Sequence, residues 1–240
     1  MPRLRMFAGP NGSGKSTMKE VIPQELLGVY VNPDEIEKAW RQSGCIDLSM
    51  FKVRVDAEEV LAFFMKSTFL ANAGFSIAVS QLRFDDNRLC LDPELVNSYF
   101  ASVVSDFIRH KLLEQKIDFT FETVMSSADK VDFLHLAKAA GFRVYLYYVA
   151  TEDPEINISR VQYRVKMHGH DVPEDKIVER YFRSLDLLVN AIRLSDRAYI
   201  FDNSSQDRIW LAEVTDGAEL EFKTDLVPHW FEEYVLDRLS

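Results

Sequence analysis

The sequence has few cysteines, fewer basic than acidic residues and no long apolar run. Its two cysteines, Cys45 and Cys90, lie far apart and match no zinc-binding spacing. We therefore expect two separate small buried residues in a reduced compartment. No apolar run approaches the length of a membrane span, and residues 1–3 lead into a short strand rather than a signal peptide, so we expect a cytoplasmic protein. The formal net charge of −10 disfavours general binding to nucleic acid or to an anionic membrane.

Several nucleotide-hydrolase signatures are also absent. The sequence contains no Leu-Ser-Gly-Gly-Gln segment and no Asn-Lys-x-Asp segment, which disfavours a transport ATPase and a GTPase switch. The His-Arg-Asp and Asp-Phe-Gly pair of protein kinases is missing as well. There is no low-complexity linker and no internal repeat, so we expect one domain over residues 1–240.

A phosphate-binding motif stands near the N-terminus. Residues 9–17 fit the pattern G-x-x-x-x-G-K-[ST], between a short apolar segment and an expected helix from about Ser16. Lys15 is expected to reach the β- and γ-phosphates of a nucleotide, and Ser16 to bind Mg²⁺. The loop amides and the helix N-terminus supply further positive charge. The expected nucleotide-binding residues are Gly9, Pro10, Asn11, Gly12, Ser13, Gly14, Lys15, Ser16 and Thr17.

Apolar runs alternate with amphipathic stretches, which predicts an α/β fold with a mostly parallel five-stranded sheet. The expected strands are residues 3–8, 29–31, 117–121, 144–149 and 198–201. Ligands bind at the carboxyl ends of strands in such sheets. Asp34, Glu122 and Asp202 follow three of these strands, so we expect one cleft there.

Residues 41–116 predict an insertion within this domain, either on the substrate side or as a structural embellishment. We expect a helix over 50–72, a hairpin of 75–82 with 88–91 around a turn at Asp85-Asp86-Asn87, and a helix over 95–114. At the C-terminus we expect a small hairpin of 209–214 with 219–222, then a helix over 228–239.

Five polar residues are candidates for phosphoryl transfer. Asp34 is a candidate general base, although an aspartate there also suits a helix cap. Glu122 and Thr123 are candidates for binding the acceptor. Glu122 also suits Mg²⁺ through water, or an ordinary strand end. Arg160 and Arg164 share one face of an expected helix, where they suit either transferring phosphate or solvent-exposed ion pairs. Arg180 and Arg183, on the expected helix after Pro173, also suit phosphates and rank below them.

The spacing His168-Gly169-His170 invites a zinc hypothesis. No further ligand is evident nearby, so a turn between two helices is favoured over a metal site.

The ordered set of motifs resembles the zeta-toxin family of small P-loop kinases, in particular the subgroup labelled "predicted ABC-type ATPase". The matching segments are 8–17, 31–36, 121–126, 160–165, 169–173, 180–185 and 201–204. The resemblance implies a three-layer P-loop NTPase fold of the nucleoside-monophosphate-kinase type that uses ATP and Mg²⁺. Segment 41–116 is longer than the family pattern, and His168 stands where glycine is usual.

The resemblance also implies a reaction. The better-known zeta toxins phosphorylate the 3′-hydroxyl of the sugar in UDP-N-acetylglucosamine. Asp34 matches their base, Glu122 their sugar-binding acid, and Arg160 and Arg164 their phosphate-binding arginines. A toxin of this kind implies a separate antitoxin protein. Two other hypotheses remain open: an ATP-gated binding protein, and a metabolite kinase without toxicity.

Overall fold

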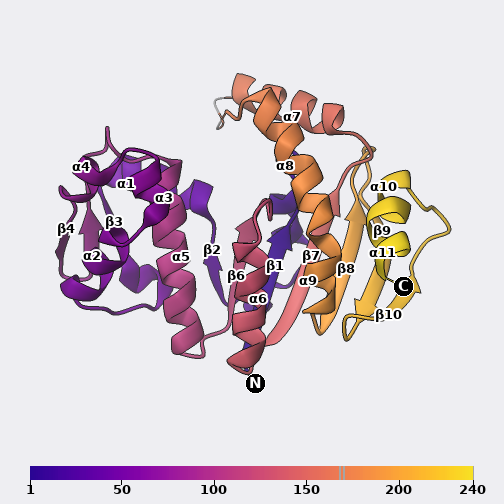
Figure 1. Cartoon of the computed structure of the whole chain (residues 1–240), viewed down its shortest axis with the longest axis horizontal. Coiled ribbons are helices and arrows are strands. Elements are labelled where there is room, and N and C mark those ends of the chain that lie inside the picture. Colours follow the sequence, from indigo (N-terminus) through magenta and orange to yellow (C-terminus); the bar gives the residue numbers. More distant parts are fainter. Residues whose placement is uncertain (168, 170, 240) are drawn as a thin grey trace. The chain divides into compact units, whose positions relative to one another are not determined.

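The computed structural model describes residues 1–167, 169 and 171–239, and the chain divides into two compact units (Figure 1). The larger unit comprises Met1–Gly28 and Thr120–Ser240. The smaller unit comprises Val29–Phe119. We describe each unit by itself.

A central sheet organises the larger unit. Its strands follow the order β10-β9-β8-β7-β1-β6. They are β1 (Arg3–Ala8), β6 (Phe119–Thr123), β7 (Arg143–Ala150), β8 (Arg197–Asp202), β9 (Ile209–Thr215) and β10 (Glu219–Phe222). The pairs β1–β7 and β7–β8 are parallel, whereas β9 and β10 form the predicted hairpin and extend the sheet beyond β8. The predicted α/β class with a parallel centre is confirmed.

Helices cover one face of this sheet. In Figure 1, α6 (Asp129–Ala139), α8 (Glu174–Asp186) and α9 (Leu188–Arg193) lie in front of the strands. Phe121 of β6 contacts Phe133 of α6, and the Tyr148 hydroxyl of β7 lies 3.0 Å from Ser184 Oγ of α8. The predicted C-terminal helix is three short helical segments: α10 (His229–Phe231), a π-helical turn (Glu232–Leu236) and α11 (Asp237–Leu239).

The predicted helix from about Ser16 was wrong in type and length. The chain forms a six-residue 3₁₀ helix, Lys15–Glu20 (η1), and then a second 3₁₀ turn, Gln24–Leu26 (η2). β-branched Val21 and Ile22 weaken helical continuation, and Pro23 cannot donate the backbone hydrogen bond that another turn needs. This region of the chain therefore supplies only a short cover for the sheet.

One helix lies beyond the carboxyl ends of the strands and packs against α8 (Figure 1). α7 (Pro154–Lys166) starts with Asp153 as its cap and proline in its first turn, which suits the fixed proline φ. It packs on α8 through a separate small core. That core contains Ile158, Val161, Val172 and Ile177.

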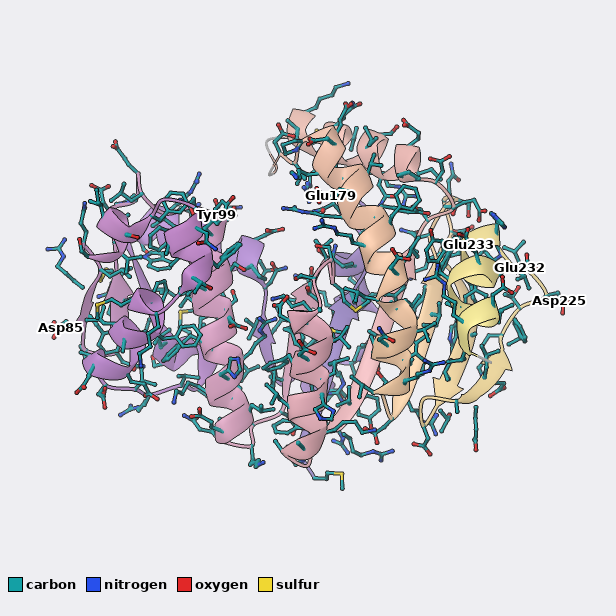
Figure 2. The ribbon with its side chains drawn as sticks, viewed as in Figure 1. Asp85, Tyr99, Glu179, Asp225, Glu232 and Glu233 are labelled. Atoms are coloured by element: carbon teal, nitrogen blue, oxygen red, sulfur yellow. A yellow bond between two sulfur atoms is a disulfide. The ribbon has the colours of Figure 1, made fainter. Side chains whose placement is uncertain are left out.

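The smaller unit contains β2 (Val29–Val31), α1 (Pro33–Ser43), β3 (Cys45–Asp47), η3 (Leu48–Phe51), α2 (Ala57–Met65), α3 (Thr68–Asn72), α4 (Ser76–Val79), β4 (Arg83–Asp85), β5 (Arg88–Cys90) and α5 (Ser98–Glu114). Trp40 of α1 is fully buried, with Phe64 of α2 and Phe100 of α5 packed edge-on against it. Figure 2 shows Tyr99 at the start of α5 and Asp85 in the hairpin.

Two expectations for this unit need correction. The helix predicted over 50–72 is divided, because the Ser67 side chain accepts from the Leu70 amide and starts α3. The predicted strand 75–82 contains α4 instead. The turn was placed correctly, since Asp86 and Asn87 both have positive φ, but it joins the shorter strands β4 and β5.

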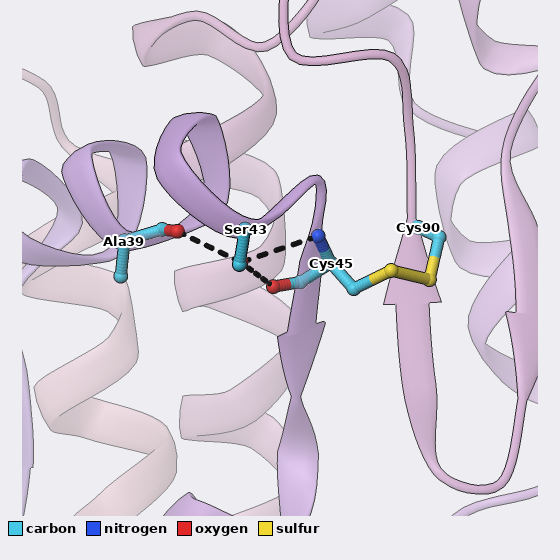
Figure 3. Close-up of a disulfide and its surroundings, with 4 residues drawn as sticks. All are labelled: Ala39, Ser43, Cys45 and Cys90. Carbon is cyan, nitrogen blue, oxygen red and sulfur yellow. Dashed lines mark hydrogen bonds between the residues drawn. A yellow bond between two sulfur atoms is a disulfide. The ribbon is translucent and has the colours of Figure 1, made fainter.

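The two cysteines form a disulfide, which contradicts our expectation of separate buried residues (Figure 3). Cys45 and Cys90 face each other across the antiparallel pair β3–β5, with their Cα atoms 4.0 Å apart. Ser43 Oγ, beside them, donates to the Ala39 carbonyl at 2.9 Å. Directly opposed residues bring their Cβ atoms close enough for a disulfide. The cysteines therefore no longer argue for a reduced compartment.

Within the residues that the structure describes, no helix combines the length and the apolar character that crossing a membrane requires.

Candidate active site

The phosphate loop lies between β1 and η1 in the larger unit. Gly9 has φ +141°, and a Cβ at this position would stand 2.0 Å from the Val149 carbonyl oxygen of β7. A side chain would therefore collide with backbone as well as force an unfavourable φ. The first residue of the motif is glycine for a reason that only the neighbouring strand reveals.

Two asparagines hold the loop from outside, and sequence analysis did not identify either as a site residue. Asn203, just after β8, donates from Nδ2 to the Ser13 carbonyl at 2.7 Å. Asn157, fully buried on α7, donates from Nδ2 to the Asn11 carbonyl. Their partners lie 190 and 146 residues away in the sequence, so no local pattern would have indicated these contacts.

Two buried side-chain oxygens of the loop have no hydrogen-bond partner among the described residues. They are Asn11 Oδ1 and Ser13 Oγ. Buried polar atoms are nearly always paired, so such atoms call for a further group. The Ser13 hydroxyl can donate to a phosphate oxygen, whereas Asn11 Oδ1 can only accept and needs a donor. The loop amides and the nearby lysine suit phosphate oxygens.

Lys15 and Ser16 lie at the end of this loop. Lys15 Nζ donates to the Pro10 carbonyl at 3.0 Å, across the loop. The Ser16 hydroxyl donates to Glu122 Oε2 at 2.9 Å. Glu122 is 7% exposed at the end of β6, so the structure brings together an alcohol and a carboxylate that sequence analysis had predicted separately. Hydroxyl and carboxylate oxygens are hard ligands that Mg²⁺ accepts, with phosphate and water completing its shell. The pair fits a magnesium ion.

Two other strand-end residues have structural contacts. Thr123 Oγ1 accepts from the Met125 amide at 3.0 Å and closes a turn. The Asp202 carboxylate accepts from the Ser204 amide at 2.9 Å and from Trp230 Nε1 at 2.9 Å. Asp202 is 3% exposed, so these bonds assign it to holding the segment after β8 rather than to binding a ligand.

The predicted arginine pair lies on α7. Arg160 Nη2 donates to the Ser205 carbonyl at 3.3 Å, which places Arg160 against the segment after β8. Its Nη1 is buried and finds no partner within the described ranges. Arg164 lies one turn further along, and its carbonyl accepts from the Gly169 amide at 2.9 Å.

Arg183, a lower-ranked candidate, pairs with Glu179 of α8 at 2.8 Å (Figure 2). The hydrogen bond from Lys176 is the main cause that lowers the pKa of Glu179, and the positive charge of Arg183 is the second. That carboxylate is therefore ionised and holds Arg183 on the helix surface.

Asp34 belongs to the smaller unit, in the first turn of α1. The alternative that it caps this helix is wrong, because Asn32 is the cap. Asn32 Oδ1 accepts from the Asp34 amide at 2.9 Å and from the Glu35 amide at 3.4 Å. The Asp34 carboxylate is exposed and is therefore left available. Its role as a base stays a prediction.

His168 and His170, the residues of the zinc hypothesis, lie outside the described residues. Across the part of the chain that is described, no three histidine, cysteine or acidic side chains gather as a metal site would require.

The parallel strands and the glycine loop between β1 and η1 define the fold of a P-loop protein. The chain belongs to the zeta toxin family, whose family model matches residues 94–215, just over half of its length.

One curated relative matches part of the sequence. An uncharacterised protein from Haemophilus influenzae is 36% identical over 72 residues, which are 30% of this chain and 51% of that protein. The match thus spans about half of the curated relative.

Two solved structures are also similar. A chain of the AvrRxo1-ORF1:AvrRxo1-ORF2 complex with sulphate ions gives a TM-score of 0.62 at 14% identity, over 100% of this chain and 65% of that one. A chain of the PezAT toxin-antitoxin system of Streptococcus pneumoniae gives 0.51 at 16% identity, over 100% and 80%. Both show a shared fold.

Proposed function

We propose that this protein is an ATP-dependent kinase that transfers the γ-phosphate of ATP to a hydroxyl of a small molecule. The observation that carries the proposal is the contact of Ser16 with Glu122 beside a loop whose buried Ser13 hydroxyl has no partner among the described residues. Family membership and the AvrRxo1-ORF1:-ORF2 complex, which has also been solved with ATP, support it.

Each group has a proposed task. The loop amides and Lys15 bind the β- and γ-phosphates, and Ser16 with Glu122 holds Mg²⁺. When bound, that ion neutralises charge on the phosphates. Arg160 and Arg164 of α7 stabilise the negative charge of the transferring group.

Asp34 acts on the acceptor. Its carboxylate accepts the proton of the acceptor hydroxyl as that oxygen attacks the γ-phosphorus, and ADP leaves. Glu122 and Thr123 orient the acceptor. We take UDP-N-acetylglucosamine as the first acceptor to test. A separate antitoxin protein is the proposed partner, since PezAT is a toxin-antitoxin system.

The test is transfer of labelled γ-phosphate from ATP to UDP-N-acetylglucosamine, beside a panel of other nucleotide sugars, nucleosides and small metabolites. Asp34→Asn should abolish transfer and keep ATP binding, whereas Lys15→Ala should weaken both. Glu58→Gln is the matched control, because Glu58 is an exposed carboxylate in the first turn of α2, as Asp34 is in α1. Transfer at the wild-type rate by Asp34→Asn would remove the base assignment. Absence of labelled product across the panel would count against the kinase.

A further inference from the structure

One cation at the phosphate loop was not predicted from the sequence. Arg208 ends the segment that joins β8 to β9, and its Nη1 donates to Thr17 Oγ1 at 2.8 Å. The guanidinium carbon lies 5.7 Å from the centroid of the Phe201 ring. Thr17 Oγ1 in turn donates to the Gly14 carbonyl at 2.8 Å. Thr17 thus links this arginine to the loop.

The segment that carries Arg208 is held at three points. Asn203 binds the Ser13 carbonyl at its start, the Ser205 carbonyl accepts from Arg160, and Arg208 meets Thr17 at its end. Anchoring at both ends sets the position of the guanidinium. An arginine prepared in this way loses less conformational entropy when it binds an anion than a mobile surface arginine does.

The Arg208 guanidinium has capacity for a ligand. It carries five N–H donors, and Thr17 is the one hydrogen-bond acceptor that the described residues offer it. Burial lowers the pKa of Arg208, and nearby Glu20 opposes that shift. The group is partly removed from water and still positively charged, a state in which an anion binds more strongly than at an exposed site.

We propose that Arg208 is a nucleotide-binding residue, whose guanidinium binds phosphate oxygens on the nucleoside side of the loop and is positioned by Thr17. The proposal rests on the proposed function. Lys15 is suited to the β- and γ-phosphates and the loop amides to the α- and β-phosphates. Thr17 follows both Lys15 and Ser16, so Arg208 adds positive charge at the end of the motif. ADP and ATP share the phosphates concerned, so both nucleotides depend on this contact.

The test is calorimetric binding of ATP and of ADP. Arg208→Ala should weaken both about tenfold, the effect of losing one hydrogen bond to a charged group. Arg208→Gln keeps a donor for Thr17 but removes the charge, and should weaken binding nearly as much. Arg143→Ala is the matched control. The guanidinium carbon of Arg143 lies 5.8 Å from the centroid of the Tyr145 ring, similar to the distance of Arg208 from Phe201, but Arg143 stands at the opposite end of β7. It should bind both nucleotides within about twofold of wild type, a change below 0.5 kcal/mol.

Thr17→Val separates positioning from folding. It removes the hydroxyl that holds Arg208, so we expect weaker binding by about threefold, and no additional loss when it is combined with Arg208→Ala. If Thr17 had a structural role alone, Thr17→Val would lower the melting temperature, and the coupling free energy between Thr17→Val and Arg208→Ala in nucleotide binding would be zero. Unchanged affinity in Arg208→Ala and Arg208→Gln, with binding lost in Lys15→Ala, would overturn the proposal and leave the kinase standing. If the wild-type protein binds no nucleotide, both proposals fail.

Discussion

Replacing Gly9 by alanine tests the geometry of the phosphate loop. A Cβ there would stand 2.0 Å from the Val149 carbonyl oxygen and 3.0 Å from Ser13 Oγ, at φ +141°. Overpacking against backbone costs about 1–3 kcal/mol, and a strained backbone conformation costs about as much again. We therefore expect Gly9→Ala to lower the free energy of unfolding of the larger unit by about 4 kcal/mol.

Gly141 supplies the control. It also has positive φ, at +81°, but a Cβ there would meet nothing within 4 Å. Gly141→Ala should therefore cost only the conformational term, about 1 kcal/mol. Urea unfolding gives both values, and calorimetry with ATP shows whether the loop still binds. Gly9→Ala should lose ATP binding, whereas Gly141→Ala should keep it. Equal stability of the two variants, with normal ATP binding in Gly9→Ala, would refute the packing argument.

Three further predictions concern other contacts. Ser16→Ala should raise the Mg²⁺ concentration for half-maximal phosphate transfer about tenfold, and an unchanged Mg²⁺ dependence would argue against Ser16 and Glu122 as its ligands. Cys45→Ser should lower the stability of the smaller unit by about 4 kcal/mol, because Cys45 and Cys90 close a loop with a sequence separation of 45. Reductant should do the same to the wild type in urea unfolding. Burial raises the pKa of Tyr147 from 10.0 to about 12, with Tyr199 adding to the shift, so stability falls as pH rises between these values because only the unfolded chain releases the proton. In pH-dependent unfolding over that range, the free energy of unfolding of Tyr147→Phe should fall by about 1 kcal/mol less than that of the wild type, after allowance for the partial exposure of the side chain. An identical fall in both proteins would remove this explanation.

Features that depend on residues adjacent in the sequence could be predicted from the sequence. The strand predicted over 144–149 is Arg143–Ala150, because a continuous apolar run suits a buried parallel strand whatever surrounds it. The turn at Asp86-Asn87 followed from residues that tolerate positive φ. The phosphate loop was recognisable for the same reason, since its glycines and Lys15 act through their own backbone and side chains.

Other local predictions failed where capping or termination outweighed apolar periodicity. The helix expected over 50–72 continues an apolar pattern, but Ser67 caps a new helix within it. The helix expected after the phosphate loop stops before Pro23. The same periodicity is compatible with one long helix or several short ones, and a single side-chain hydrogen bond decides between them.

Only the tertiary structure decided which distant residues meet. Cys45 and Cys90 are paired by the register of β3 with β5. Asn203 and Arg208 reach the phosphate loop because β8 ends beside β7, which lies beside β1. The sequence by itself determined a phosphate-binding loop and the strands that carry it, since these follow from local backbone preferences and hydrophobic pattern. The order of the strands decides which side chains contact the phosphate loop, and this order is a long-range property that no local segment encodes.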